Sequence, residues 1–439
     1  MNLPEEFKIY TRELMGEELY RTLEQGLEQD VPASIRLNPF KVNGLVIGDD
    51  ELENKDDKAI QTANVPWCKN GFYLENRPNF TFDPLLHAGA YYVQEASSMF
   101  LDLVLRTYVK EPVLMLDSCA APGGKTTCAM SALPEGSVLF SNEPMHTRAN
   151  ILAENIQKFG HPDILVTNNY PRDYKKTKLQ FDVILTDVPC SGEGMFRKDA
   201  GAIEEWSMEN VEKCWQLQRS IVEDLWNNLK PGGLLIYSTC TFNTHEDEEN
   251  VEWIAKELGA DLLEVPVEES WNITGSLIHG NNGKLGGELP VYRFIPGKTK
   301  GEGLFMAILR KHGEYQKEEQ ISTPSDKELK GLRILTHGIQ PDTIKGKNTI
   351  PDQSKALSIL PDKDEYPKVE VEWKEAINYL RKEAITLAAD APKGIVLICY
   401  KGYPLGFAKN LGNRANNLYP QEWRIKSSHL PEAIPEILK

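Results

Sequence analysis

The sequence predicts an α/β fold in which a parallel sheet carries helices on both faces. From residue 112 onward, short apolar runs alternate with amphipathic segments, which is typical of parallel strands joined by crossover helices. Hydrophobic residues make up 41% of the chain and charged residues 26%, a composition that can bury a core. The length of 439 residues corresponds to two or three domains.

Five short apolar runs are expected to form the parallel strands. They are PVLMLD (112–117), SVLFSNE (137–143), DILVTN (163–168), FDVILTD (181–187) and GLLIYST (233–239). Between the second and third runs, residues 147–160 have the spacing of an amphipathic helix. The runs ELPVYRFIP (288–296) and GLFMAILRK (303–311) predict an antiparallel hairpin that closes the sheet.

The regions on either side follow other patterns. Residues 5–28 predict an amphipathic helix, and residues 34–42 alternate like a strand. The acidic stretch 48–58 predicts a surface loop. This N-terminal part is therefore expected to be an α+β domain.

The C-terminal third is expected to contain a connector and a small separate β domain. Residues 312–368 are rich in charged residues, Pro and Ser, which favours a loosely packed connector. Residues 372–388 predict a helix, and 394–410 predict two strands around a Gly–Tyr–Pro turn. The expected segments are an N-terminal region (1–105), the sheet domain (106–312), the connector (313–368) and the C-terminal domain (369–439).

Composition excludes several classes of protein. No run of about 18 uncharged apolar residues is present, so no membrane span is expected. The charged N-terminus lacks the apolar core of a signal peptide, which favours a cytoplasmic location. Seven cysteines occur without a CxxC pair, so neither a metal site nor a disulfide framework is expected.

The net charge of −16 argues against a nonspecific nucleic-acid coat protein, although a selective enzyme needs only a local basic face. The carboxylates are expected to cluster away from the motifs described next, for example in 48–57 and 245–250.

A glycine-rich loop follows the first predicted strand. It consists of Cys119, Ala120, Ala121, Pro122, Gly123, Gly124 and Lys125. Glycines let a ligand approach the backbone closely, and the amides of the following helix would face that ligand. Glu143 ends the second strand, twenty residues after Gly123, where a carboxylate accepts hydrogen bonds from both ribose hydroxyls of an adenosine.

Two other nucleotide-binding loops do not fit. The chain has no GxGxxG motif, and GxxxxGK[ST] fails because Cys119 stands where its first glycine belongs. The adenosine of S-adenosylmethionine fits best, so the sheet is expected to be a Rossmann-like methyltransferase sheet. The alternative is that Gly123 and Gly124 only form a tight turn and that Glu143 is a surface acid.

Two cysteines follow the fourth and fifth strands, in DVPCSGEG and STCTF. The carboxyl ends of parallel strands share one edge, so Cys190 and Cys240 are expected beside the cofactor. A thiolate that adds to carbon 6 of cytosine makes carbon 5 nucleophilic. Asp187 is placed to activate N3 of the base. A second thiol can assist loss of the carbon 5 proton, so that the adduct is released. Either cysteine alone is more simply a buried small hydrophobe, but the pair favours catalysis.

These motifs resemble those of the Sun-type (Nol/Nop/Sun) RNA cytosine-5 methyltransferases, and most closely the F-type bacterial branch that acts on small-subunit ribosomal RNA. The similar segments are RLNP (36–39), HAGAYYVQEASSM (87–99), DSCAAPGGKTT (117–127), DVPCSGEGMFRKD (187–199) and STCTF (238–242). The segments 401–410 and 416–425 resemble a PUA-like RNA-binding domain. The resemblance implies a 16S ribosomal RNA or small-subunit partner, and we expect a monomer without a metal.

The resemblance also implies a role for individual residues. Cys240 matches the nucleophile, Cys190 the product-release cysteine, and Asp187 the aspartate that contacts the methionine end of the cofactor and the base. Residues 119–125 match the cofactor loop and Glu143 the ribose acid. Two basic residues, Lys198 and Arg36, are expected near the RNA.

One position departs from the family pattern. Where the family has an Asp for the adenine, this chain has Asn168–Asn169–Tyr170, so Asn169 or Tyr170 is expected to make that contact. Two other functions remain open. A DNA cytosine-5 methyltransferase would use the cysteine of the Pro–Cys motif as nucleophile, and a ribosome-assembly factor would bind RNA and cofactor without catalysis.

Overall fold

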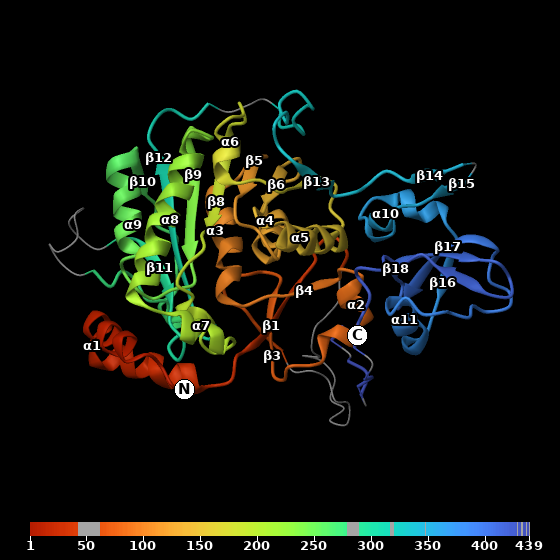
Figure 1. The fold of residues 1–439 in the computed structure, drawn as a ribbon, viewed down its shortest axis with the longest axis horizontal. Helices are drawn as coiled ribbons and strands as arrows, with labels where there is room; N and C mark the ends of the chain where they lie inside the picture. The colour runs from red at the N-terminus through yellow and green to blue at the C-terminus, as the bar shows by residue number, and fades with distance from the viewer. Residues whose placement is uncertain are drawn as a thin grey trace.

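The computed structural model describes residues 1–42, 62–278, 289–316, 320–346 and 348–427, and also 429–431, 433–435 and 437–438. The acidic stretch 48–58 lies outside the described residues. A large sheet with helices on both sides forms the centre of the molecule, with α1 (Glu5–Glu28) at one end and the C-terminal strands at the other (Figure 1). Among the described residues, no helix combines the length and apolar character needed to cross a membrane.

The central sheet contains all five predicted parallel strands. They are β5 (Leu114–Asp117), β6 (Val138–Asn142), β7 (Ile164–Thr167), β8 (Phe181–Asp187) and β9 (Leu229–Thr239). Their spatial order is β9-β8-β5-β6-β7, and every neighbouring pair is parallel. The chain order reverses between β5 and β8, which makes this edge the point where a doubly wound sheet binds ligands.

The closing hairpin is confirmed. Strands β11 (Val291–Phe294) and β12 (Leu304–Lys311) pair antiparallel, and β12 also pairs antiparallel with β9. A short strand, β10 (Ala260–Leu262), pairs with the far end of β12 and finishes this side of the sheet.

Helices cover both faces of the sheet because successive strand residues point to opposite sides. On β5, Met115 belongs to the core beneath α3 (Phe100–Tyr108), α4 (Gly124–Ala132) and α5 (His146–Phe159). The next residue, Leu116, belongs to the core beneath α8 (Met208–Trp226). The predicted helix over 147–160 is confirmed by α5.

The prediction of a loosely packed connector is wrong for part of 313–368. Strand β13 (Ile334–His337) adds to the central sheet by pairing antiparallel with β7. A hairpin of β14 (Thr343–Lys345) and β15 (Asn348–Ile350) and the helix α10 (Gln353–Leu357) follow. The charged composition hid this strand, because an edge strand needs few apolar side chains.

The N-terminal region is α+β, as predicted. Helix α1 is interrupted at Gly16, whose φ of 72° is left-handed. Its sheet has the order β2-β3-β1-β4, with the bounds β1 (Ala33–Leu37), β2 (Thr62–Asn64), β3 (Gly71–Leu74) and β4 (Tyr91–Val93). The strand expected over 34–42 ends at Leu37, because Pro39 has no amide for the ladder and Asn38 begins a turn.

The C-terminal region is a β domain whose sheet has the order β16-β17-β18-β19. Its elements are β16 (Lys368–Glu370), α11 (Trp373–Leu380), β17 (Gly394–Tyr400), β18 (Tyr403–Asn410) and β19 (Ala415–Asn417). The two predicted strands are confirmed, whereas the helix expected over 372–388 ends at Leu380, two residues before Lys382 adopts a φ of 65°.

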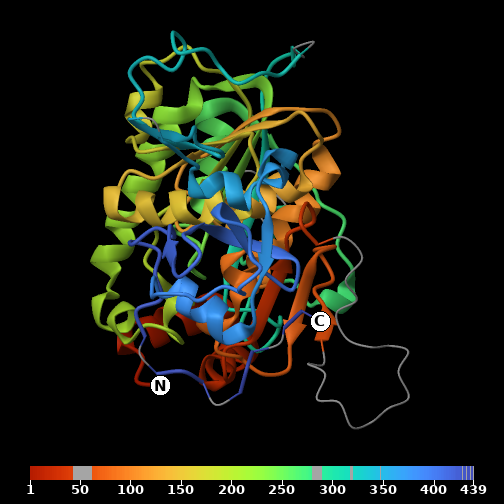
Figure 2. The same ribbon diagram turned by 90° about the vertical axis from the view of Figure 1, so that its right-hand side faces the viewer.

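This domain is not separate from the N-terminal region, contrary to the prediction. Ile35 of β1 and Leu85 of α2 (Pro84–His87) share one core with Ile377 of α11. The Trp373 indole donates a hydrogen bond to the carbonyl of Phe82 at 2.9 Å. In Figure 1, α11 lies beside α2, and Figure 2, which looks onto the right-hand side of that view, shows the C-terminal strands in front of the central sheet.

Candidate active site

A cleft of about 400 Å³ opens where β5, β8 and β9 end. It is lined by most of the predicted cofactor loop, from Cys119 to Lys125, and by Asp187, Lys198 and Cys240. The topology that reverses at β5 therefore brings together residues from three separate sequence motifs. Cys190 and Glu143 do not line the cleft, but the Cys190 sulfur lies 2.8 Å from that of Cys240, and Glu143 directly follows β6.

The backbone of the glycine-rich loop has a conformation that depends on glycine. Gly123 has a φ of 113°, which L side chains rarely adopt, and it is the residue before α4. A Cβ on Gly124 would lie 3.3 Å from the ring of Tyr92. The Ala120 amide donates to the carbonyl of Asn142 at 2.8 Å, which ties the loop to β6. A bound ligand can thus approach this backbone closely.

Glu143 is a buried carboxylate at the second strand end, and not a surface acid. It is 1% exposed. Its Oε1 accepts a hydrogen bond from the Met145 amide at 3.0 Å, and its Oε2 lies 3.5 Å from Arg148 Nη1. Its position and its acceptor oxygens suit the two ribose hydroxyls of an adenosine.

Asp187 joins the cofactor loop to the strand that precedes Cys240. Its Oδ2 lies 2.9 Å from Lys125 Nζ, and its Oδ1 accepts from Ser238 Oγ at 2.7 Å. Burial alone would lower the pKa of Lys125, but the Asp187 carboxylate outweighs this and raises it. A lysine at the base of the cleft therefore keeps its charge, and Asp187 has a fixed orientation.

The two predicted cysteines are adjacent. Their sulfur atoms lie 2.8 Å apart, and the Cys240 amide donates to Cys190 Sγ at 3.4 Å. Both are free thiols. The contact with the Cys240 side chain, and then the burial of the group, raise the pKa of Cys190 well above its ordinary value. Cys190 therefore favours the neutral thiol.

The acidic stretch 245–250 contacts the neighbours of Cys240, which the sequence interpretation missed. Asp247 and Glu248 are fully buried, and both pair with Arg293 at 2.8–2.9 Å. Asp247 Oδ1 accepts hydrogen bonds from Thr239 and Thr241, the two neighbours of Cys240, at 2.6 and 3.2 Å. The expectation that these carboxylates lie away from the motifs is wrong, because their counter-ion comes from a strand that is distant in the sequence.

The Asn169 side chain is engaged with Arg333, and the adenine contact expected of it stays a prediction. Its oxygen accepts from the Arg333 amide at 2.9 Å and its nitrogen donates to the Arg333 carbonyl at 3.1 Å. The residue is 7% exposed and holds the chain next to β13. Tyr170 is 56% exposed, and the Arg172 guanidinium lies 5.0 Å from its ring centre. The adenine contact expected of Tyr170 also stays a prediction.

The two predicted RNA contacts differ. Arg36 is 1% exposed and donates hydrogen bonds to Gln94, Thr127 and Ser131, so it ties the N-terminal sheet to α4. Its assignment to RNA is wrong, since a buried guanidinium with three partners cannot reach a phosphate. Lys198 is 37% exposed at its side chain, lies in the cleft and pairs with Glu302.

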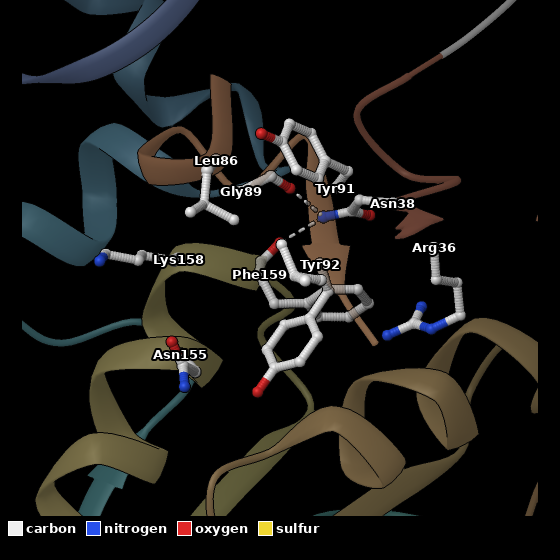
Figure 3. A pocket seen from close by; sticks show the side chains of 10 residues that line it. Arg36, Asn38, Leu86, Gly89, Tyr91, Tyr92, Asn155, Lys158 and Phe159 are labelled. Carbon is white, nitrogen blue, oxygen red and sulfur yellow. Dashed lines mark hydrogen bonds between the residues drawn. The ribbon is translucent and has the colours of Figure 1, made fainter. Parts of the chain in front are cut away.

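A second cavity, of about 220 Å³, lies between β4 and α5 (Figure 3). Tyr92 lines both this cavity and the cleft. The Asn38 amide donates to the carbonyls of Gly89 and Phe159, both at 2.9 Å. Asn38 thus joins the segment after β1 to the end of α5. Within the described part of the chain, no group of three or more His, Cys, Asp or Glu residues could hold a metal.

Three family models match consecutive parts of the chain. Residues 104–310 match the 16S rRNA methyltransferase RsmB/F, residues 3–96 match the N-terminal domain of the 16S rRNA methyltransferase RsmF, and residues 366–425 match the PUA domain of RsmF. Together they cover the catalytic sheet and both flanking regions.

Relatives over the full length and solved structures agree with these matches. The ribosomal RNA small subunit methyltransferases F of Cronobacter sakazakii and Erwinia tasmaniensis are 29% and 28% identical, over 96% and 89% of this chain and 96% and 90% of theirs. A methyltransferase homolog from Pyrococcus horikoshii is 27% identical with a TM-score of 0.56, over 68% of this chain and 92% of its own.

NSun6 from the same organism, solved with SFG, shares the fold at 20% identity and a TM-score of 0.57, over 71% of this chain and 99% of its own. The central sheet, the glycine-rich loop and the paired cysteines occur in one arrangement with both RsmF-type flanking regions. The chain belongs to the RsmB/F methyltransferase family.

Proposed function

We propose that this protein transfers a methyl group from S-adenosylmethionine to carbon 5 of a cytosine in 16S ribosomal RNA. The observation that carries the proposal is the pair of free thiols, Cys190 and Cys240, with sulfur atoms 2.8 Å apart beside the cleft. Methylation of a carbon atom as unreactive as C5 requires a covalent nucleophile, and a second thiol next to it suits a release step.

The cleft fits the cofactor. Residues 119–125 would hold its methionine end together with Asp187, and Glu143 would accept its ribose hydroxyls. Tyr170 would cover the adenine. When bound, the cofactor supplies a methyl group on a positively charged sulfur. Lys125, with its raised pKa, keeps its own charge and holds Asp187 in a fixed orientation through their 2.9 Å pair.

The chain supplies the remaining steps. The Cys240 thiolate forms a bond to carbon 6 of the cytosine, and Asp187 holds the N3 side of the ring, so that carbon 5 becomes nucleophilic. After methyl transfer, the carbon 5 proton passes to the Cys190 sulfur in its deprotonated form, while the bond between carbon 6 and sulfur breaks and Cys240 leaves as a thiolate, which restores the ring. We assign this release to Cys190, which stands next to the Cys240 sulfur.

The substrate assignment rests on the relatives, which are named as small-subunit ribosomal RNA methyltransferases over the full length of this chain. The RsmF-type N-terminal and PUA regions share one core and would grip the surrounding RNA as a unit. The target base must leave its stack to reach Cys240. An enzyme with this substrate would work in the cytoplasm, where small subunits assemble.

Mapping of 5-methylcytosine in 16S ribosomal RNA tests the proposal. Cells without the protein should lack one modified cytosine, and the wild-type gene should restore it while Cys240→Ala should not. A DNA cytosine-5 methyltransferase would instead leave 16S RNA unchanged and alter DNA. An assembly factor without catalysis would be rescued equally by Cys240→Ala.

A further inference from the structure

Two buried carboxyl groups connect the loop after β8 with the loop after β9. Glu193 belongs to the first loop and is 1% exposed, and Glu246 follows the second and is 0% exposed. Each accepts a hydrogen bond from the backbone of the opposite loop. Glu193 Oε2 accepts from the Phe242 amide at 2.6 Å, and Glu246 Oε2 accepts from the Ser191 amide at 3.1 Å.

Asn243 joins the two carboxyl groups. Its side-chain nitrogen donates to Glu193 Oε1 at 3.0 Å and to Glu246 Oε1 at 2.9 Å, and its side-chain oxygen accepts from the Glu246 amide at 2.8 Å. The loops also meet directly, since the Gly194 amide donates to the Cys240 carbonyl at 2.7 Å. We refer to Glu193, Asn243 and Glu246 as the carboxyl latch.

The latch is an unusual use of buried acids. No ion pair joins Glu193 or Glu246 to a lysine or arginine among the described residues, and burial raises the pKa of Glu193 to about 7. Buried polar groups without a counter-ion are unfavourable unless donors satisfy them. Gln218 and Trp206 donate to Glu246 and Glu193 from outside the loops. The other donors belong to the two cysteine loops, so separation of the loops would take Phe242 and Asn243 from Glu193 and Ser191 from Glu246.

We propose that the carboxyl latch sets the position of Cys190 relative to Cys240, and that its three members are positioning residues. Ser191 directly follows Cys190, and Phe242 is two residues after Cys240, so each carboxyl fixes the backbone beside one sulfur. The consequence for catalysis rests on the proposed function, because addition and release there require both sulfurs at one cytosine ring.

The first test needs no RNA. Diamide takes two hydrogens from neighbouring thiols, which leaves a disulfide and a hydrazine, and disulfide geometry tolerates little displacement. The rate of Cys190–Cys240 disulfide formation in the full chain, followed by peptide mass mapping, therefore reports their alignment. Glu193→Gln and Glu246→Gln each replace a carboxyl oxygen, which accepts hydrogen bonds, with an amide nitrogen, which donates them. Each variant should therefore slow disulfide formation by about tenfold or more.

Trp206→Phe is the matched control. The Trp206 indole donates to Glu193 Oε1 at 3.1 Å from outside both loops, so its loss leaves every bond between the loops intact. This variant should oxidise at the wild-type rate. Asn243→Ala, which keeps both carboxyls, gives a second measurement if a glutamine variant does not fold, and it should also be slow. Unchanged rates in folded latch variants, or equal slowing in Trp206→Phe, would overturn the proposal.

The second test measures methylation of 16S RNA. Latch variants should have a kcat about 100-fold lower, because a small misplacement of reacting groups can reduce the rate by this much. KM for S-adenosylmethionine should be unchanged, because residues 119–125 lie on another loop. An unaltered kcat with slow oxidation would overturn the catalytic consequence alone. If the wild-type protein does not methylate RNA, the proposed function fails, and the oxidation rates still decide whether the latch positions the cysteines.

Discussion

The side-chain amide of Asn169 and the backbone of Arg333 form two hydrogen bonds, at 2.9 and 3.1 Å, which join the end of β7 to the segment that leads into β13. Both polar atoms of the side chain are engaged in this contact. Asn169 thus stabilises an edge of the sheet, and we expect the adenine contact to come from another residue.

Asn169→Ala should therefore lower the free energy of unfolding by roughly 1–3 kcal/mol, because two backbone groups of Arg333 lose buried partners. Affinity for S-adenosylmethionine should change little. Urea unfolding and calorimetric titration measure the two quantities, and Asn76→Ala, at an exposed position, should alter neither. A large loss of cofactor affinity without loss of stability would restore the adenine role.

Glu143→Ala should weaken S-adenosylmethionine binding by about 100-fold or more. A charged acceptor contributes roughly 1.5–3 kcal/mol to each hydrogen bond, and the ribose would lose two. Glu135→Ala, an exposed glutamate in the loop before β6, is the control and should bind normally. Calorimetric titration distinguishes them, and equal affinity of both variants would place the ribose away from β6.

The fold and the site were predictable to different degrees. The five parallel strands and both cysteines could be placed because apolar runs and strand-end motifs are local signals. The edge strand β13 could not, since its segment is charged and pairs through its backbone. The buried role of Glu246 also escaped prediction, because its partner Ser191 lies 55 residues earlier in the sequence and only the parallel packing of β8 and β9 brings the two together.

Arg36 shows the same limit of sequence-based prediction, here for a residue whose predicted role was wrong. A basic residue in a motif shared with RNA enzymes suggests an RNA contact, yet its three hydrogen-bond partners lie at 94, 127 and 131. Sequence shows that a residue is charged, but whether the charge faces solvent or a neighbouring domain depends on long-range packing.

Asp117 should make stability depend on pH. Burial, and then the nearby Asp187 carboxylate, raise the pKa of Asp117 from 3.8 to about 7. Between about pH 4 and about pH 7 the unfolded chain has lost this proton while the folded protein keeps it, so this contribution to stability is full at low pH and is lost as pH rises.

Asp117→Asn removes that dependence. The stability of the wild type relative to the variant should fall by about 1.4 kcal/mol for each pH unit across this window. Urea unfolding at several pH values measures the difference. Asp390→Asn, at an exposed position, should follow the wild type. A constant difference between wild type and Asp117→Asn would show that Asp117 is ionised in the folded protein throughout.

Lys198→Ala should weaken binding to 16S RNA and reduce the salt dependence of that binding by about one charge, as expected for the loss of one phosphate contact. Lys198 is half-exposed at the mouth of the cleft, and it also borders a groove lined by Arg77 and Lys300. Lys213→Ala, on the exposed surface of α8, is the control and should leave the salt slope unchanged. Identical slopes for the two variants would remove Lys198 from the RNA surface.

The adjacent thiols give the most direct prediction about the reaction. Cys240→Ala should abolish methylation without trapping RNA, because addition to carbon 6 cannot begin. Cys190→Ala should still add and methylate but fail to eliminate, so that protein and RNA remain crosslinked. The raised pKa of Cys190, caused by its contact with the Cys240 side chain and by burial, supports this division, since a thiol that holds its proton is a poor nucleophile.

A denaturing gel of each variant, incubated with 16S RNA and S-adenosylmethionine, decides between the roles, and Cys214→Ala, a cysteine outside the cleft, should behave as wild type. A slowly migrating RNA adduct with Cys190→Ala alone supports the assignment. The same adduct with Cys240→Ala alone would exchange the roles and indicate the mechanism of a DNA enzyme. Full methylation by both variants would exclude a covalent intermediate, because no other cysteine lines the cleft except Cys119, whose thiol has its pKa raised to about 12 by burial.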